Sequence, residues 1–253
     1  MSWRLGVVGH PVGHSLSPRL HRAGLAQAGL VGTSRAVDVT DLAALAAVLP
    51  AFDALSVTMP LKALATQLCD DLDEVAARTG RVNSLLRTEG RVRGANTDGR
   101  GLLDALAAVG WEPAGRRAAV LGAGGAAWSI VDALVGAGTE VAVATRRPAA
   151  GAALAERYPG LRSLRPGEAL DLVVNTVPAA QRGEQPAVVV AAPGAVAVDI
   201  TYEPRVSAWL AQHERHHWIT MNGLPMLAHQ GARQMAWWFS VPIDGAGLLE
   251  VLA

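Results

Sequence analysis

The chain has 253 residues, enough to bury one large core or two modest ones. It carries 22 basic and 22 acidic residues, and this formal net charge of zero gives no reason to expect a nucleic acid or an anionic membrane as a partner. No apolar run reaches the length of a membrane span, and a single cysteine, Cys69, excludes an internal disulfide. We therefore expect a cytoplasmic protein without a leader segment.

Lysine usage is the most unusual feature of the composition. The basic residues are 21 arginines and one lysine, Lys62. Arginine stays protonated at any working pH, whereas a lysine ammonium can lose and regain a proton. Because this chain uses arginine at nearly every cationic position, we expect its single lysine, Lys62, at a position where arginine cannot serve in its place. The alternative is a solvated lysine that remains by chance.

The predicted elements of the first hundred residues alternate between strands and helices. Apolar runs bounded by turn residues predict strands over 5–9, 35–39 and 54–58. Helical periodicity predicts helices over 20–29, 41–48 and 61–68, the second capped by Asp41. Alternation of this kind is typical of parallel βαβ units.

The pattern restarts after a connecting helix predicted over 99–110. Strands are predicted over 117–122, 140–145, 170–175 and 195–199, and helices over 126–136 and 149–158. A last helical stretch begins at 224 and can pack back on the first domain. The sequence therefore predicts an α/β protein with two domains. The N-terminal α/β domain covers 1–98 and is completed by 224–253, and a Rossmann-like, doubly wound domain covers 99–223.

A glycine-rich turn, GAGGAA over 122–127, lies between a predicted strand and a predicted helix. It fits the pattern G-x-G-x-x-A of dinucleotide-binding turns, in which backbone N–H groups and the helix N-terminus approach a pyrophosphate. A simple helix-entry turn is the alternative.

At the end of the next strand, Thr145, Arg146 and Arg147 stand where an NAD site usually has a carboxylate. Two guanidiniums can bind a 2′-phosphate, so NADP(H) is the predicted cofactor, unless both are solvated charges in a turn.

Polar residues of the first domain form two groups. Ser15 and Ser17 precede a helix, where two hydroxyls beside N–H groups suit a small carboxylate, although Ser17 could simply cap the helix. Lys62 lies at a strand-to-helix turn, where functional groups gather in parallel sheets. Asn83 and Asp98 follow. A lysine with a carboxylate and an amide nearby can hold a hydroxyl group and move its proton, but each of these residues could also be a satisfied turn residue.

Seven segments, taken in order, form a recognisable set. They are GHPVGHSLSP (9–18), SVTMPLK (56–62), RVN (81–83), NTDG (96–99), GAGGA (122–126), DITYEP (199–204) and GLPMLAHQ (223–230). Together they resemble the shikimate dehydrogenase family over nearly the whole chain. One such segment alone would be weak evidence, whereas seven in order are specific. The resemblance implies the reversible, NADPH-dependent reduction of 3-dehydroshikimate to shikimate on the route to chorismate and the aromatic amino acids. It implies no metal.

The resemblance also implies roles for particular residues. Lys62 corresponds to the family's catalytic base, paired with Asp98, which agrees with the lysine argument above. Ser15 and Ser17 correspond to the residues that bind the substrate carboxylate. The residues implied around the ring hydroxyls are Thr58, Lys62, Asn83, Asp98 and Gln230, with Tyr202 lining the same cleft. The residues implied at the cofactor are Gly122, Ala123, Gly124, Gly125, Ala126, Thr145, Arg146, Arg147, Ile200 and Gly223.

Four positions depart from the family's pattern. His10 stands where Asn is usual, Ser84 where Thr is frequent, and Thr145 where Asn is common. Trp128 replaces a frequent Arg after the glycine turn. Without that Arg, a 2′-phosphate depends more heavily on Arg146, or else the pocket accepts both NADP and NAD.

Two rival functions stay open. A quinate or aminoshikimate dehydrogenase would run the same chemistry on another cyclohexane acid. A non-catalytic dinucleotide-binding sensor would keep the fold, but such a relative is expected to have lost Lys62 or Asp98, and both are present. We expect a small-molecule substrate as the partner and a monomer or a homodimer as the assembly.

Overall fold

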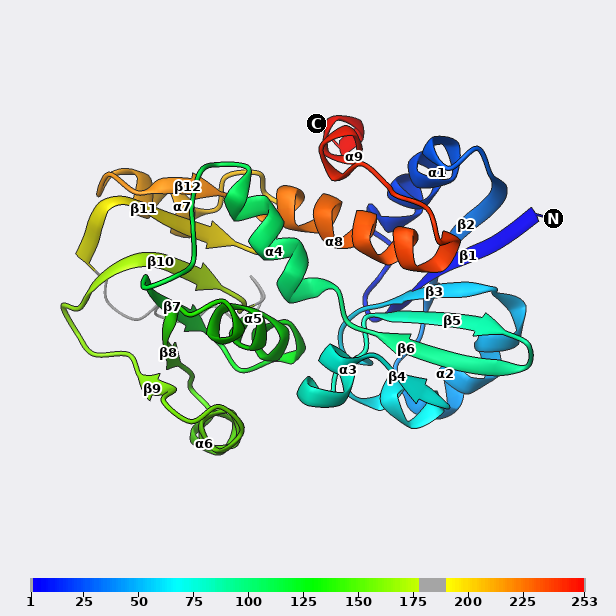
Figure 1. Ribbon diagram of the computed structural model, residues 1–253, viewed down its shortest axis with the longest axis horizontal. Coiled ribbons are helices and arrows are strands. Elements are labelled where there is room, and N and C mark those ends of the chain that lie inside the picture. Colours follow the sequence, from blue (N-terminus) through cyan, green and yellow to red (C-terminus); the bar gives the residue numbers. More distant parts are fainter. Residues whose placement is uncertain (1, 178–189, 253) are drawn as a thin grey trace. The chain divides into compact units, whose positions relative to one another are not determined.

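The computed structural model describes residues 2–177 and 190–252. The chain divides into two compact units, one formed by Met1–Gly101 with Leu227–Ala253 and the other by Leu102–Met226. It passes between them within two helices, α4 (Asp98–Ala107) and α8 (Gly223–Phe239), and each unit has a β-sheet of its own (Figure 1).

The first unit contains, within its described residues, a sheet of six strands in the order β2-β1-β3-β5-β6-β4. The strands are β1 (Ser2–Gly9), β2 (Val31–Asp38), β3 (Ala54–Val57), β4 (Asp71–Leu72), β5 (Ser84–Thr88) and β6 (Arg91–Ala95). The helices are α1 (Ser17–Gln27), α2 (Leu42–Val48), α3 (Glu74–Thr79), α9 (Gly245–Leu252) and the 3₁₀ helices η1 (Leu49–Ala51) and η2 (Leu64–Leu68). The strands β2, β1 and β3 are parallel, whereas β5 runs antiparallel to both β3 and β6.

Alternating side chains of β3 show how helices cover both faces of this sheet. Leu55 and Val57 belong to the apolar core that includes residues of α2 and α3. Ser56 lies between them and points to the other face, where it contacts His21 of α1 and Gln234 of α8. The polar residue in the middle of a buried strand therefore joins two helices that are far apart in the sequence.

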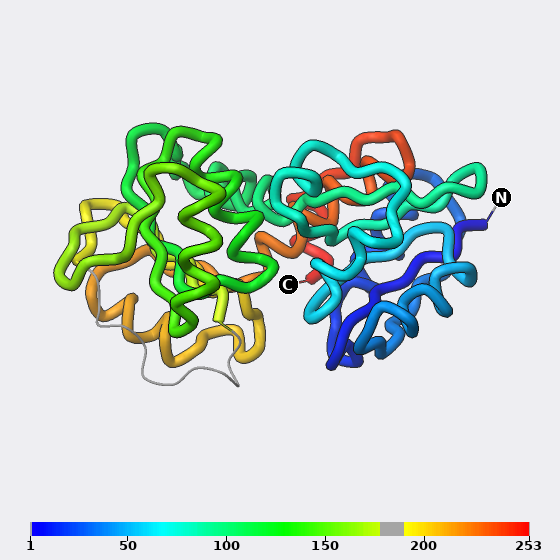
Figure 2. The backbone as a smooth tube through the Cα atoms, turned by 90° about the horizontal axis from the view of Figure 1, so that it is seen from below, coloured from blue at the N-terminus to red at the C-terminus, as the bar shows by residue number. Residues whose placement is uncertain are grey.

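The end of the chain packs against its beginning. Helix α9 lies beside α1 (Figures 1 and 2). The connection before α9 is held by Gln27, whose side chain accepts from the backbone N–H of Asp244 at 2.8 Å and donates to its carbonyl at 3.3 Å. The prediction that the C-terminal helices return to the first domain is confirmed.

The second unit contains, in its described part, a sheet of six parallel strands in the order β12-β11-β10-β7-β8-β9. The strands are β7 (Arg117–Leu121), β8 (Glu140–Ala144), β9 (Arg162–Ser163), β10 (Ala169–Asn175), β11 (Val190–Asp199) and β12 (Ile219–Met221). The helices that lie wholly within it are α5 (Gly125–Gly136), α6 (Pro148–Arg157) and α7 (Ala208–Glu214).

Both faces of this parallel sheet are buried. Val120 of β7 lies in the core shared with α4 and α5, whereas Ala119 and Leu121 lie in the core shared with Trp209 and Leu210 of α7. Burial on two faces explains why these strands read as continuous apolar runs rather than as alternating patterns. The unit is the predicted Rossmann-like, doubly wound domain.

Two features of the first unit differ from the predictions. The segment 61–68 was expected to be an α-helix, but it is a turn followed by the 3₁₀ helix η2. The Lys62 carbonyl accepts from the N–H of Val82 at 2.8 Å. This carbonyl therefore binds a residue just before β5 instead of an N–H in the next turn of its own segment. The predicted parallel βαβ units also do not include the β5–β6 hairpin, in which Glu89 and Gly90 adopt φ of 51° and 79°. Positive φ at both turn residues is typical of tight hairpins.

Helix capping follows the prediction at α2. The Asp41 side chain accepts from the N–H of Ala44 at 2.9 Å and so satisfies one donor of the first turn.

None of the helices among residues 2–177 and 190–252 is long and apolar enough to cross a membrane.

Candidate active site

A buried lysine–carboxylate pair lies in the first unit. Lys62 belongs to the turn after β3, and Asp98 is the first residue of α4, directly after β6. The Lys62 Nζ donates to Asp98 Oδ2 at 2.5 Å, and the two side chains are only 14% and 6% exposed. A charge pair that is shielded from water in this way interacts more strongly than a surface pair, and removing either partner leaves an uncompensated buried charge.

Asn83 holds the other oxygen of the carboxylate. Its Nδ2 donates to Asp98 Oδ1 at 2.8 Å and lies 3.0 Å from Thr97 Oγ1 and 3.1 Å from Gln230 Oε1. Its Oδ1 accepts from the backbone N–H of Thr97 at 3.0 Å, which fixes the orientation of the amide. Asn83 is 3% exposed, so the side chain that aims Asp98 is itself immobilised by packing.

Gln230 reaches this cluster because α4 and α8 approach closely. A Cβ at Gly101 would lie 2.4 Å from the Gln230 Cβ, so only glycine allows this approach. The Gln230 Nε2 donates to the carbonyl of Leu227 one turn earlier, which leaves its Oε1 toward Asn83. Thr97, which joins the cluster, lies in the NTDG segment but was not singled out from the sequence.

Ser15 and Ser17 form a second polar group before α1. The Ser15 Oγ lies 3.2 Å from Ser17 Oγ and accepts from the Ser17 N–H at 3.2 Å. The alternative that Ser17 caps the helix is wrong, because Ser17 is the first helical residue and Leu16 occupies the cap position. Ser15 takes up a first-turn N–H instead, which leaves the Ser17 hydroxyl for other partners.

Thr58 follows β3 at the start of the same turn that carries Lys62. Its N–H donates to the Val8 carbonyl at 2.9 Å, and its carbonyl accepts from Leu61 at 2.9 Å. A Cβ at Gly9 would meet the Thr58 methyl group at 2.4 Å, so β1 and this turn are in close contact. The backbone of Thr58 is therefore fixed while its side chain is half-buried.

The glycine turn of the second unit has the geometry of a phosphate cradle. Gly122 has φ of +107° and donates to the Ala144 carbonyl at 2.8 Å, and a Cβ there would lie 2.5 Å from Thr176 Oγ1. Gly124 is the N-cap residue of α5, and a Cβ there would meet no atom within 4 Å among the residues that the structure describes, apart from its own chain neighbours. The N–H groups of Gly125 and Ala126 open the helix. An uncapped N-terminus with room beside it suits an anion, so these residues fit the pyrophosphate of a dinucleotide.

The basic pair lies at the end of β8. Arg146 and Arg147 are both exposed. Arg147 donates to the carbonyl of Ala123 in the glycine turn at 3.3 Å, and its N–H donates to Thr145 Oγ1 at 3.2 Å. The strand end that carries Arg146 is therefore joined directly to the cradle. Nearby on α5, Trp128 packs at 6.4 Å from the Tyr158 ring, so it contributes apolar packing where an Arg would contribute charge.

The segment after β11 is fixed against the start of α8. Asp199 accepts from the Thr201 hydroxyl at 2.8 Å and from Ser207 Oγ at 2.7 Å. The Gly223 N–H donates to the Thr201 carbonyl at 2.9 Å, and a Cβ at Gly223 would lie 2.1 Å from the carbonyl oxygen of Ile200. Tyr202 follows in the same segment and is half-buried.

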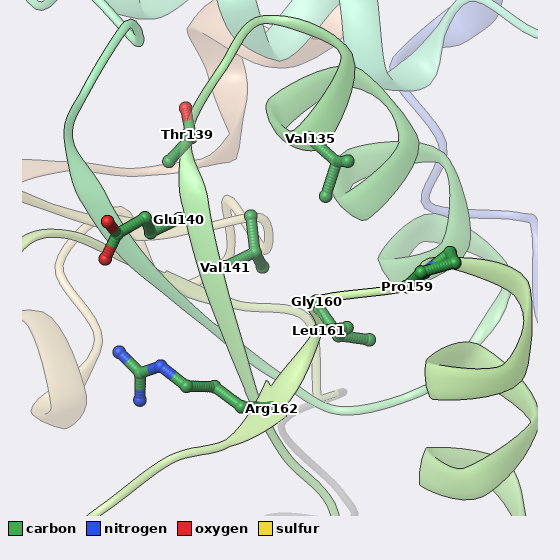
Figure 3. A pocket seen from close by; sticks show the side chains of 8 residues that line it. All are labelled: Val135, Thr139, Glu140, Val141, Pro159, Gly160, Leu161 and Arg162. Atoms are coloured by element: carbon green, nitrogen blue, oxygen red, sulfur yellow. The ribbon is translucent and has the colours of Figure 1, made fainter.

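A separate pocket of about 270 Å³ lies in the second unit between the end of α5, the start of β8 and the α6–β9 connection (Figure 3). Its lining includes Glu140 and Val141, whereas the glycine turn contacts Ala144 at the other end of the same strand. It is therefore distinct from the cradle. No group of His, Cys, Asp or Glu side chains with metal-site geometry occurs among the residues that the structure describes.

A doubly wound parallel sheet with a glycine cradle, together with an α/β unit that holds a buried lysine–carboxylate pair, defines a two-domain α/β oxidoreductase that binds a nicotinamide dinucleotide. Comparison with known proteins specifies the family. The sequence-family model described as shikimate dehydrogenase substrate binding domain matches residues 7–85. A shikimate dehydrogenase (NADP(+)) of Acidiphilium cryptum (strain JF-5) is 40% identical over 98% of this chain and 95% of its own. The chain belongs to the shikimate dehydrogenase family.

Solved structures agree with this assignment. Shikimate 5-dehydrogenase from Thermus thermophilus, in complex with NADP(H) and shikimate, has a TM-score of 0.85 and 37% identity, and the match covers 98% of each chain. The ligand-free 5-ketofructose reductase of Gluconobacter sp. strain CHM43 has a TM-score of 0.84 and 26% identity, over 100% of this chain and 98% of that one. A similar fold thus also occurs in a reductase named for a different substrate.

Proposed function

We propose that this protein catalyses the reversible, NADP-dependent reduction of 3-dehydroshikimate to shikimate. The observation that carries the proposal is the 2.5 Å pair of Lys62 and Asp98, held on its second oxygen by Asn83. Any lysine–carboxylate pair in this chain must involve Lys62, because Lys62 is the single lysine. Identity of 40% to a shikimate dehydrogenase (NADP(+)) over nearly the full length supports the same conclusion.

Lys62 moves the proton of the reaction. Bound NADPH supplies the hydride that reduces the ring carbonyl carbon. The Lys62 ammonium donates a proton to the carbonyl oxygen as it becomes a hydroxyl, and in the reverse direction the neutral amine accepts that proton. Asp98 keeps the Nζ in place through Oδ2, while the remaining lone pairs of its carboxylate can accept from a substrate hydroxyl. Fixed geometry of donor and acceptor is the main contribution of this pair.

The polar residues of the first unit bind and orient the substrate. The hydroxyls of Ser15 and Ser17 donate hydrogen bonds to the substrate carboxylate, which the first-turn N–H groups of α1 also favour. Thr58, Asn83 and Gln230 contact the ring hydroxyls, and Tyr202 contributes from the segment after β11. The match of residues 7–85 to a substrate binding domain supports a substrate role for 1–98, completed by 224–253.

The residues of 99–223 bind NADP(H). The cradle of Gly122, Ala123, Gly124, Gly125 and Ala126 receives the pyrophosphate, and Thr145 with its two following arginines receives the 2′-phosphate. The segment at Ile200 and the start of α8 at Gly223 line the nicotinamide end. Trp128 supplies no charge, so the 2′-phosphate depends chiefly on Arg146. The protein acts in the cytoplasm as a monomer or a homodimer.

A panel of substrates tests this proposal against its rivals. Shikimate and quinate, each with NADP⁺ and NAD⁺, are compared by kcat/KM, with 5-ketofructose and NADPH as a further pair because a reductase of that name has a similar fold. The proposal requires shikimate with NADP⁺ to give the highest value. A preference for quinate or 5-ketofructose would change the substrate assignment. Binding of NADPH with no turnover of any of these compounds would favour a dinucleotide sensor.

A further inference from the structure

A buried histidine lies outside the groups that bind or react. His21 of α1 is 1% exposed, and both ring nitrogens have partners: Nδ1 is 2.7 Å from Ser34 Oγ and Nε2 is 2.9 Å from Ser56 Oγ. Its ring meets Trp238 edge-on at 5.2 Å. Burial, and to a smaller extent the charge of Arg22, lowers its pKa to about 3. His21 is therefore a neutral ring inside the first unit.

The contacts of Gln234 fix the direction of every hydrogen bond in this group. A backbone carbonyl can only accept, so the Nε2 of Gln234 donates to the Asn83 carbonyl at 2.9 Å. Its Oε1 must then face Ser56, whose hydroxyl donates to it at 2.5 Å. Having given its only proton, Ser56 must accept from His21, so the ring carries its proton on Nε2. The unprotonated Nδ1 accepts from Ser34.

The resulting chain of four hydrogen bonds ends at the backbone of Asn83. The carbonyl of Asn83 receives Gln234 Nε2–H at 2.9 Å and the N–H of Val57 at 2.8 Å. The side chain of the same residue donates to Asp98, the partner of Lys62. A shift of this backbone would therefore move the amide that aims the carboxylate.

We propose that His21, Ser56 and Gln234 are positioning residues whose buried, proton-ordered hydrogen bonds hold Asn83 against the Lys62–Asp98 pair. The inference rests on the proposed function for its catalytic consequence but not for its hydrogen-bond order. None of the three residues touches the reacting pair, and all act through Asn83. Small errors in the geometry of catalytic groups are enough to cost about a hundredfold in rate.

The adjacent strand supplies a matched control. Ser84 of β5 lies directly opposite Ser56 in the sheet, and both serines are buried. The Ser84 Oγ is buried and has no hydrogen-bond partner within the part of the chain that the structure describes. Removing it takes away the same atom from the same region without touching the chain of hydrogen bonds.

The first test compares kinetics. Ser56→Ala and Gln234→Met are expected to lower kcat about tenfold or more while KM for NADP⁺ changes less than twofold, and Ser84→Ala is expected to keep kcat within twofold. His21→Gln keeps an N–H donor near the Nε2 position and should retain far more activity than His21→Leu. Thermal unfolding of each variant checks that all are folded at the assay temperature. Equal kcat in Ser56→Ala and Ser84→Ala, or equal loss in the two His21 variants, would overturn the proposal.

The second test reads the hydrogen-bond order directly. In the wild-type protein at pH 7, the ¹⁵N chemical shifts of His21, assigned by comparison with His21→Gln, are expected to show a neutral ring protonated on Nε2. A ring protonated on Nδ1, or on both nitrogens, would overturn the proposed order. This measurement needs no turnover, so a wild-type protein inactive on shikimate would refute the proposed function while the order of the hydrogen bonds is still tested.

Discussion

Replacement of Lys62 by arginine separates charge from proton transfer. Lys62→Arg keeps a cation beside Asp98, whose side chain is 6% exposed and whose carboxylate would otherwise lie buried without compensation. The folded state should therefore lose little stability. The guanidinium stays protonated at any working pH, however, and cannot exchange a proton with the substrate oxygen. Loss of general acid–base catalysis typically lowers the rate by ~10²–10⁴, which corresponds to about 3–5.5 kcal/mol in activation free energy.

The assay measures kcat and KM for shikimate oxidation, the Kd of shikimate and the unfolding midpoint for wild type and variant. We expect kcat to fall by at least two orders of magnitude and Kd to change much less. Lys62→Met is the comparison, because it also removes the charge and should destabilise the fold by about 3–5 kcal/mol. A Lys62→Arg variant that turns over within a few-fold of wild type would refute the proton-transfer role.

Three further predictions concern substrate, cofactor and pH. Ser15→Ala and Ser17→Ala should each weaken shikimate binding by about 1.5–3 kcal/mol, measured as KM; an unchanged KM in both folded variants would leave them only a structural role. Arg146→Ala should raise KM for NADP⁺ about tenfold or more and barely affect NAD⁺, and equal losses with both cofactors would contradict the 2′-phosphate contact. Because the folded pKa of His21 lies at about 3, below the unfolded value, the unfolded chain binds the proton first as pH falls. The free energy of unfolding should therefore drop below about pH 6.5, by up to ~1.4 kcal/mol per pH unit. In urea titrations at pH 7 and 5, His21→Gln should show a smaller drop, and an identical drop would contradict the burial of a neutral ring.

The sequence predicts the central strands of the second unit well because strands such as β7 and β10 are buried on both faces. The helix α7 and the short edge strands β9 and β12 have no counterpart among the predicted elements. Continuous apolar runs such as the one around Val120, followed by glycine and a helix, have few competing interpretations. The first unit is less regular. The short β5–β6 hairpin turns at Glu89 and Gly90, and these two residues are a weak turn signal in the sequence. The segment after Lys62 does not form an α-helix, because the Lys62 carbonyl is hydrogen-bonded to Val82.

The candidate site could be predicted in part for a chemical reason. Lys62, Asn83 and Asp98 stand out because polar groups at strand ends are exceptions to an apolar pattern. The hydrogen-bond chain through His21 and Gln234 could not be found in this way. These two residues are far apart in the sequence, and a buried histidine on a helix looks like any other member of its apolar face until its partners are known.

The most direct test of the account is the product of the reaction itself. Purified wild-type protein is mixed with shikimate and NADP⁺, and the NADPH formed is compared with the 3-dehydroshikimate formed. We predict that one molecule of NADPH and one of 3-dehydroshikimate form for every shikimate consumed. The reaction with quinate or with NAD⁺ is expected to be slower or absent. A folded protein that binds NADP⁺ yet forms no NADPH from shikimate would contradict the central claim that Lys62 and Asp98 serve this oxidation.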